Sequence, residues 1–174
     1  MKIYLTNLGR YNEGYLVGKW VKLPVCEEVL DKVLKEIGIN EYYEEYFITD
    51  YENDIVGIGD VISEYSSVQA LNELAQRLEG LSDYEADKLG AVLEYEACRS
   101  VSDVLDLLDK LDEFDLLTNV TDDEELGYYY AEEYCSIDIP ENIQPYFDYE
   151  AYGRDIRLES NCLYTSYGFL LDNR

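Results

Sequence analysis

Residues 3–38 read IYLTNLGRYNEGYLVGKWVKLPVCEEVLDKVLKEIG, and this stretch decides the fold class. Its first part predicts two strands, from Ile3 to Leu8 and from Tyr15 to Leu23, which are separated by a glycine-containing loop and stopped by a proline. Its second part has apolar residues at helical spacing, which predicts a helix from Glu27 to Ile37 that ends at Gly38. Strands and a helix in one short segment indicate an α+β fold.

The rest of the chain is also predicted to contain both strands and helices. Alternation from Glu45 to Tyr51 predicts a third strand, so residues 1–61 are expected to form a small antiparallel sheet with a helix. Residues 62–112 are expected to be helical throughout, and residues 113–174 to form a C-terminal α+β domain. The sequence therefore divides into three segments, and its length suggests one or two domains, or three if they are very small.

Two segments fit capping boxes, in which a Ser or Thr side chain and a Glu side chain each satisfy a free backbone N–H. These are Ser82 to Glu85 and Thr121 to Glu124. The second box opens a predicted helix from Asp122 to about Tyr134.

Shorter elements are expected near the C-terminus. A short helical turn is predicted to start at Ile139 to Glu141. Strands from Ile156 to Leu158 and from Leu163 to Thr165 are predicted to form a terminal sheet.

The net charge of −26 is the strongest signal in the composition. Thirty-nine acids stand against thirteen bases. Such a chain lacks the clustered Lys and Arg that nucleic-acid binding needs, so nucleic acid is not expected as a partner. Duplex DNA carries about two negative charges per base pair, so one chain matches the phosphate charge of about 13 base pairs, and a dimer about 26. The composition favours a basic macromolecular partner.

Catalysis and metal binding are poorly supported. The chain has no histidine, which excludes Ser-His-Asp and Cys-His arrangements and His-ligated metals. The segment from Asp50 starts like a calcium loop, but Ile55 stands where that loop needs glycine and Val61 where it needs a bidentate glutamate. We therefore predict a protein that is not an enzyme and that has no cofactor and no metal.

Composition also sets expectations for location and for the cysteines. No segment approaches a membrane span and the N-terminus does not resemble a signal peptide, so a cytoplasmic protein without a membrane partner is expected. The four cysteines lie far apart without a C-x-x-C pair, so they are expected to be buried free thiols. These residues are Cys26, Cys98, Cys135 and Cys162.

Nineteen tyrosines form the second unusual feature. Many are interleaved with acids, as in Tyr128 to Tyr130 and in the run from Tyr146 to Tyr152. Tyrosine suits internal packing, and it also suits a partner surface where its ring faces arginine. The sequence leaves both interpretations open.

Acids at helical spacing mark a candidate partner surface. From Val101 to Leu111 the apolar residues form one helical stripe, and acids fall mostly on the other side. Carboxylates three or four residues apart repel, so a helix built only for stability would alternate the signs. A solvated face is the simpler interpretation, but the shortage of bases favours a partner. The candidate acidic face consists of Asp83, Glu85, Asp87, Glu94, Asp103, Asp106, Asp109, Asp112, Glu113, Asp122, Asp123, Glu124, Glu125, Glu132 and Glu133.

Three blocks resemble a known family. Residues 8–20, LGRYNEGYLVGKW, resemble the opening signature of the ArdA-type antirestriction proteins. Residues 44–52, EEYFITDYE, and residues 149–156, YEAYGRDI, resemble two later blocks of that family, in the expected order. Residues from about 62 to 120 share only acidic helical character with it.

The resemblance implies imitation of DNA, and the charge arithmetic separately indicates an anion of the size of a short duplex. Members of this family are encoded on plasmids and conjugative transposons, and they imitate bent B-form DNA. The resemblance implies competitive occupation of the DNA groove of a type I restriction-modification enzyme, formed by its methyltransferase core and specificity subunit, in the cytoplasm of a bacterial host. It implies inhibition of restriction and leaves inhibition of modification open.

The resemblance also implies an elongated, curved molecule of three small domains, 1–61, 62–112 and 113–174, which forms a homodimer through residues 113–174. Two chains this negative repel each other, so an interface needs aromatic burial and local positive charge. The candidate interface residues are Tyr146, Phe147, Tyr149, Tyr152, Arg154 and Arg157. A competing interpretation is that the two arginines brace the terminal sheet within one chain.

Two other functional classes remain open on the sequence. An acidic chaperone or buffer for basic nucleic-acid-binding proteins would use the same charge without duplex-like geometry. A halophilic or calcium-dependent enzyme is a weaker third interpretation. A rigid, regularly spaced carboxylate face would favour the DNA mimic, whereas turnover or metal binding would favour the enzyme.

Overall fold

A computed structural model describes residues 1–55, 57–134 and 139–174 of the chain. These residues form seven α-helices and two three-stranded antiparallel sheets, which confirms the predicted α+β class. Cys135 is one of the four cysteines predicted to be buried thiols, but it lies outside the described residues.

The chain divides into two compact units. One consists of residues 1–86 and 97–109, and the other of residues 87–96 and 110–174. The three-domain arrangement is not confirmed by this grouping, and the predicted limits near residues 61 and 112 stay predictions.

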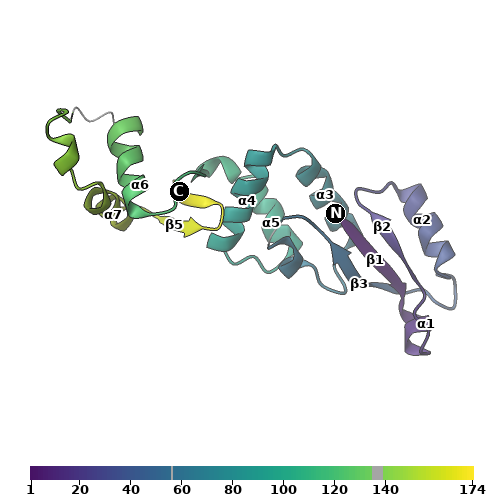
Figure 1. Cartoon of the computed structure of the whole chain (residues 1–174). Helices are drawn as coiled ribbons and strands as arrows, with labels where there is room; N and C mark the ends of the chain where they lie inside the picture. Colours follow the sequence, from purple (N-terminus) through teal and green to yellow (C-terminus); the bar gives the residue numbers. More distant parts are fainter. Residues whose placement is uncertain (56, 135–138) are drawn as a thin grey trace. The chain divides into compact units, whose positions relative to one another are not determined.

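The first unit is built on a sheet with strand order β2-β1-β3. The strands β1 (Lys2–Asn7), β2 (Gly18–Lys22) and β3 (Tyr46–Glu52) match the three predicted strands, although β2 is shorter at its start. Helix α2 (Glu27–Glu36) is confirmed and contacts β2 (Figure 1). Ile3 and Leu5 of the central strand are fully buried, which makes β1 the centre of this unit's core.

One predicted loop in this unit is a helix. Residues 8–12 form α1 (Leu8–Asn12), which directly follows β1. The Asn7 side chain caps it by accepting the N–H of Arg10 at 2.9 Å. A helix of five residues is too short to show helical periodicity, so its glycine-containing sequence suggested a loop.

Three helices follow, as the sequence predicted for residues 62–112. They are α3 (Val68–Glu79), α4 (Asp83–Tyr95) and α5 (Val101–Leu108). The first turn of α4 belongs to the first unit and its remainder to the second.

The helix starts in this region are fixed by side-chain caps. The predicted box at the start of α4 is confirmed, since the Glu85 carboxylate accepts the N–H of Ser82 at 2.8 Å. A second box, which the sequence analysis missed, starts α5. There Asp103 accepts the N–H of Ser100 at 3.0 Å, and the Ser100 hydroxyl accepts the N–H of Asp103 at 3.3 Å.

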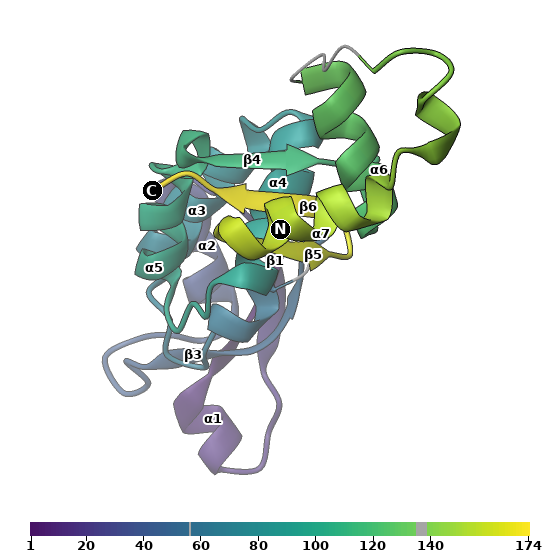
Figure 2. The same ribbon diagram turned by 90° about the vertical axis from the view of Figure 1, so that its left-hand side faces the viewer.

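The second unit contains a sheet with strand order β4-β6-β5 (Figure 2). Its strands are β4 (Phe114–Leu117), β5 (Cys162–Thr165) and β6 (Gly168–Asp172). The predicted strand from Leu163 to Thr165 is confirmed as part of β5, whereas β4 and β6 were not predicted.

The predicted strand from Ile156 to Leu158 is wrong. These residues lie inside α7 (Tyr149–Glu159), which is capped by Asp148. Apolar and charged residues alternate there as in a half-buried strand, but the segment continues a helix whose capped start fixes its conformation.

Helix α6 (Asp123–Tyr128) continues as a π-helix, Tyr129–Tyr134, which confirms the predicted helix over residues 122–134. Its capping box is placed wrongly by one residue in the sequence analysis. Asp122 is the N-cap, and Glu125, not Glu124, accepts the N–H of Thr121 at 2.8 Å. The short helical turn expected from Ile139 to Glu141 occurs slightly later, as a 3-10 helix at Gln144–Tyr146.

Helices α6 and α7 pack with their backbones in contact. A Cβ atom added to Gly127 would overlap the Tyr149 carbonyl oxygen, and one added to Gly153 would overlap the Asp123 carbonyl oxygen. Only glycine permits this approach at either position. Beside the crossing, Leu126 of α6 packs with Phe169 of β6 in the core of the unit.

The cysteine prediction is partly wrong. Cys26, Cys98 and Cys162 are thiols, as expected, but Cys26 is exposed and the other two are only half-buried. Within the described residues, no helix is long and apolar enough to cross a membrane.

Candidate partner surface

The predicted acidic residues lie on or next to α4, α5, α6 and the π-helix that continues α6. All of them except Asp123 and Glu132 are exposed. Exposure follows from the amphipathic sequence, because the buried sides of these helices carry residues such as Leu89, Val104 and Leu126.

Several of the exposed carboxylates have a local structural task. Glu85, Asp103, Asp122 and Glu125 accept backbone N–H groups at helix starts. Bonds from the N–H groups of Arg99 and Ser100, together with the Ser100 hydroxyl, lower the pKa of Asp103. A helix N-terminus favours negative charge, and the bonds hold these carboxylates in fixed positions.

Two others accept hydrogen bonds from distant parts of the chain. Glu94 of α4 accepts the backbone N–H of Ser166 at 2.9 Å and also the Ser166 hydroxyl, in the turn between β5 and β6. Asp109 accepts a bond from Arg77 of α3 at 2.7 Å, so its charge is partly neutralised.

Asp123 differs from the other predicted residues because its carboxylate is engaged inside the fold. It accepts two bonds from the Arg157 guanidinium, at 2.7 and 2.9 Å, and one from the Tyr164 hydroxyl at 2.8 Å. Its side chain is 20% exposed, and the bonds from Arg157 hold the pKa of Asp123 below its ordinary value. Glu132 is similarly engaged, since it accepts the Tyr149 hydroxyl at 2.6 Å.

The remaining predicted acids are exposed, and within the described residues their carboxylates have no hydrogen-bond or ion-pair partner. We call them the open acids. They are Asp83, Asp87, Asp106, Asp112, Glu113, Glu124 and Glu133.

Positive charge does little to neutralise these carboxylates, which are divided between the two units. Ion pairs in the described residues join bases mainly to acids outside the predicted face, such as Glu13, Glu36 and Glu52. Of the predicted face, Asp109 and Asp123 are the residues that take part. The open acids therefore present uncompensated negative charge to solvent.

Three of the predicted interface residues, Phe147, Tyr149 and Tyr152, form an aromatic group at the start of α7. The rings of Tyr149 and Tyr152 pack against that of Phe147, with centroids 4.8 and 5.8 Å away. Tyr146 projects from this group and is 83% exposed. Arg157 braces α6 within the chain through Asp123, whereas Arg154 is exposed and lies 3.8 Å from Asp155.

Within the described residues, no group of three or more Cys, Asp or Glu side chains could hold a metal ion. The sequence analysis missed a groove in the first unit where Glu27 and Glu64 flank apolar side chains. Its residues come from three separate segments, so no local sequence pattern marks it.

Comparison with known protein families gives a match over almost the whole chain. A family model described as antirestriction protein (ArdA) matches residues 3–171. The chain belongs to the ArdA antirestriction family. A comparison with curated proteins finds no match.

The ArdA blocks recognised in the sequence have structural tasks in this fold. Residues 8–20 form α1 and the connection into β2, and residues 149–156 form the first two turns of α7. Gly153 in the latter block permits the contact with α6. The open acids lie outside these blocks, so the residues that carry the ArdA resemblance are distinct from those predicted to meet a partner.

Proposed function

We propose that this ArdA chain inhibits type I restriction-modification enzymes by occupying their DNA-binding groove as a protein imitation of bent duplex DNA. The observation that carries the proposal is the set of open acids, which are exposed and uncompensated in a chain of net charge −26. Family membership supports an antirestriction role and a restriction enzyme as the partner. The site of action would be the cytoplasm of a bacterial host.

The mechanism is competition for lysine and arginine side chains. Carboxylates of the acidic face would replace phosphates in contacts with the methyltransferase core and the specificity subunit. Counterions released from both surfaces would make binding strongly dependent on salt. Because phosphate contacts carry no sequence information, one inhibitor would act on enzymes with different target sequences. No step requires catalysis, a cofactor or a metal.

Helix caps support imitation of a rigid duplex. Glu85, Asp103 and Glu125 are each fixed by backbone bonds at the start of a helix. Carboxylates held in this way can present a defined pattern of charge, which an unstructured acidic chaperone does not need. We therefore favour the mimic over the chaperone.

A displacement experiment tests the proposal. The chain is titrated into a type I methyltransferase bound to labelled duplex DNA, and release is followed by fluorescence anisotropy at several salt concentrations. We expect complete release, with an affinity that falls steeply as salt rises. A ternary complex that retains DNA at saturation contradicts the mechanism. Equal affinity for an unstructured polybasic protein would favour the chaperone.

We further propose that the working unit is a homodimer joined through the C-terminal unit. One chain carries the charge of about 13 base pairs, and a two-fold dimer would present the acidic face twice. Tyr146 and Arg154 offer an exposed ring and an exposed base near each other in sequence. Sedimentation of the wild type and of a Tyr146→Ala/Arg154→Ala variant tests this. A wild type that stays monomeric at tens of micromolar and still inhibits contradicts it.

A further inference from the structure

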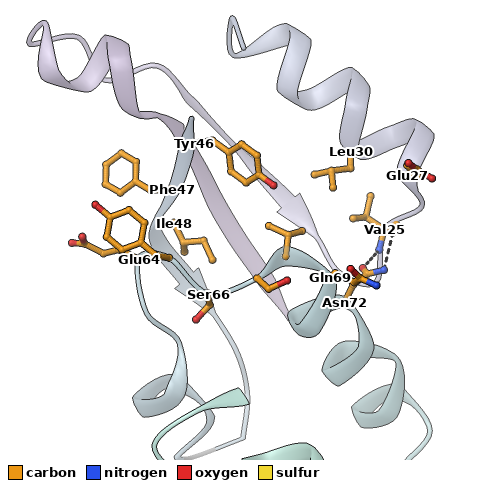
Figure 3. A pocket seen from close by; sticks show the side chains of 13 residues that line it. Val25, Glu27, Leu30, Tyr46, Phe47, Ile48, Glu64, Ser66, Gln69 and Asn72 are labelled. Atoms are coloured by element: carbon orange, nitrogen blue, oxygen red, sulfur yellow. Dashed lines mark hydrogen bonds between the residues drawn. The ribbon is translucent and has the colours of Figure 1, made fainter. Parts of the chain in front are cut away.

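A groove of about 680 Å³ lies between α2, β3 and the start of α3. We call it the β3 groove, and Figure 3 shows its side chains. Leu30, Ile48 and Val68 give it an apolar lining, and Ile48 and Val68 are themselves buried. The Glu27 and Glu64 side chains lie at opposite ends of the view, and both residues are exposed.

The walls of the groove are held in place by hydrogen bonds. Asn72 of α3 accepts the N–H of Val25 at 2.5 Å and donates to the Val25 carbonyl at 2.9 Å (Figure 3). This pair of bonds ties the segment before α2 to α3. On the other side, Ile48 donates its N–H to the Glu64 carbonyl at 2.8 Å. The groove is therefore built by the fold before any partner binds.

One wall of the groove is the outer edge of β3. The N–H of Ile48 points away from β1, because it is bonded to Glu64. The N–H of Leu8 is bonded to the Glu45 carbonyl, so Glu45 faces β1. Backbone groups in an antiparallel ladder alternate between the two edges, so the N–H and C=O of Tyr46 also face outward. Within the described residues, these outward-facing N–H and C=O groups of Tyr46 have no hydrogen-bond partner.

This combination indicates the chemistry of an occupant. On the outer edge of β3 the N–H of Ile48 is already bonded to Glu64, so the part left open is the backbone of Tyr46. Its N–H and C=O can pair with one residue of an extended peptide, and side-chain pockets then select the neighbouring residues. Apolar side chains in the groove suit aliphatic stems, and the two glutamates suit positive heads. Tyr65, which is 72% exposed and stacks on Phe47 with centroids 6.5 Å apart, adds an aromatic face for a guanidinium group.

We infer that the β3 groove binds a short extended segment of a partner protein, pairing its backbone with Tyr46 as a short added strand and placing its arginine or lysine side chains against Glu27 and Glu64. The inference rests on the proposed function in that the partner would be the restriction enzyme. Duplex DNA has no polypeptide backbone and cannot make this contact. Binding at the groove would therefore add a protein–protein contact to the imitation of phosphates.

Peptide binding tests the groove directly. The probe is acetyl-Val-Arg-Val-Arg-Val-amide, titrated into the ¹⁵N-labelled full chain at physiological salt. We expect shifts of the Tyr46 and Ser66 amides that saturate. The Glu27→Gln/Glu64→Gln variant should bind the probe about five- to tenfold more weakly, the range expected from losing two exposed ion pairs.

Matched controls separate the groove from general attraction to an acidic chain. Glu28 follows Glu27 in the first turn of α2, and Glu73 is an exposed residue of α3. Glu28→Gln/Glu73→Gln removes the same charge outside the groove and should leave affinity within about twofold. An N-methylated probe keeps its charge but cannot pair as a strand, and it should not shift Tyr46.

Each other result overturns the inference. Equal weakening in both double variants would show diffuse electrostatics, and equal binding of a valine-only peptide would show a purely apolar groove. Binding of the N-methylated probe at Tyr46 would exclude strand addition. DNA displacement is measured separately with the wild type. Its failure would refute the proposed function while leaving the peptide result intact.

Discussion

Asp123 shows how one residue of an acidic face can belong to the fold instead. Its sequence context, between Asp122 and Glu124 at a helix start, is indistinguishable from that of its exposed neighbours. In the structure it joins α6 to Arg157 of α7 and to Tyr164 of β5. A carboxylate with three bonds from two elements is a structural anchor, and it is a poor candidate for contact with a partner.

Asp123→Asn should destabilise the chain by about 1–3 kcal/mol, because it removes charged hydrogen bonds and leaves Arg157 and Tyr164 incompletely paired. The midpoint of urea unfolding measures the loss. Glu124→Gln is the control, since Glu124 is exposed and is one of the open acids, and it should change stability by less than about 0.5 kcal/mol. Equal effects of the two changes would contradict an anchoring role.

Asp172 makes stability depend on pH in a definite direction. Two bonds from Arg174, both 2.8 Å, lower the pKa of Asp172 from 3.8 to about 2. A carboxyl with a lowered folded pKa contributes stability that is fully present above its unfolded pKa and is lost as pH falls through the folded value. The window for Asp172 is therefore about pH 4 down to about pH 2.

The stability difference between the wild type and Asp172→Asn should be constant above about pH 4 and shrink towards pH 2. Urea unfolding of both proteins across this range measures it. Taking the difference removes the general effect of protonating the other acids. A difference that stays constant down to pH 2, or that grows, would refute the link to Asp172.

At the scale of elements, the α6–α7 crossing depends on two glycines. Gly127 and Gly153 bring the helix backbones so close that a methyl group at either position would overlap a carbonyl oxygen. The same crossing carries the pair between Asp123 and Arg157. Because the crossing supports the sheet through Leu126 and Phe169, its loss would spread through the second unit.

Gly153→Ala should destabilise the second unit by about 3 kcal/mol or more, the upper part of the range for overpacked sites. Exchange of backbone amide hydrogens measures the effect separately in each unit. Protection from exchange should fall in β4, β5, β6 and α6. Gly80→Ala is the control, since its new Cβ would meet the Arg77 carbonyl oxygen at 3.4 Å, which is an ordinary contact. It should be neutral or slightly stabilising. Unchanged protection in the Gly153 variant would refute close helix packing.

At the scale of the whole molecule, the predicted face is a set of unequal acids. Asp103 is committed to a helix cap and Asp109 to Arg77, so neutralising either also perturbs the fold. The open acids carry no such task. They are therefore the residues with which the charge of the face can be tested without removing a capping hydrogen bond or an ion pair.

Neutralising four open acids together, Asp106→Asn, Asp112→Asn, Glu113→Gln and Glu124→Gln, should weaken inhibition of a type I enzyme roughly ten- to a hundredfold. Any one change should cost about fivefold at most, because exposed ion pairs are individually weak. The control set changes Glu28, Glu41, Glu44 and Glu73 to glutamine, which removes equal charge from exposed positions outside the predicted face. Equal weakening by both sets would show that total charge matters and the face does not.

Local signals in the sequence were sufficient for much of the fold. Three strands of the first unit, α2, the helices of residues 62–112 and the α6 helix follow from periodicity and caps that lie within a few residues of one another. Composition set the charge and excluded histidine chemistry, and short blocks indicated the ArdA family. These properties are local or additive, so no knowledge of distant contacts is needed to derive them.

Tertiary structure decided what depends on distant residues. It paired β4 with β6 and separated the engaged Asp123 from the exposed Glu124. It also assembled the β3 groove from three segments of the first unit. The physical reason is that burial and pairing are set by partners far along the chain, and two carboxylates adjacent in sequence differ only in what the fold brings to them.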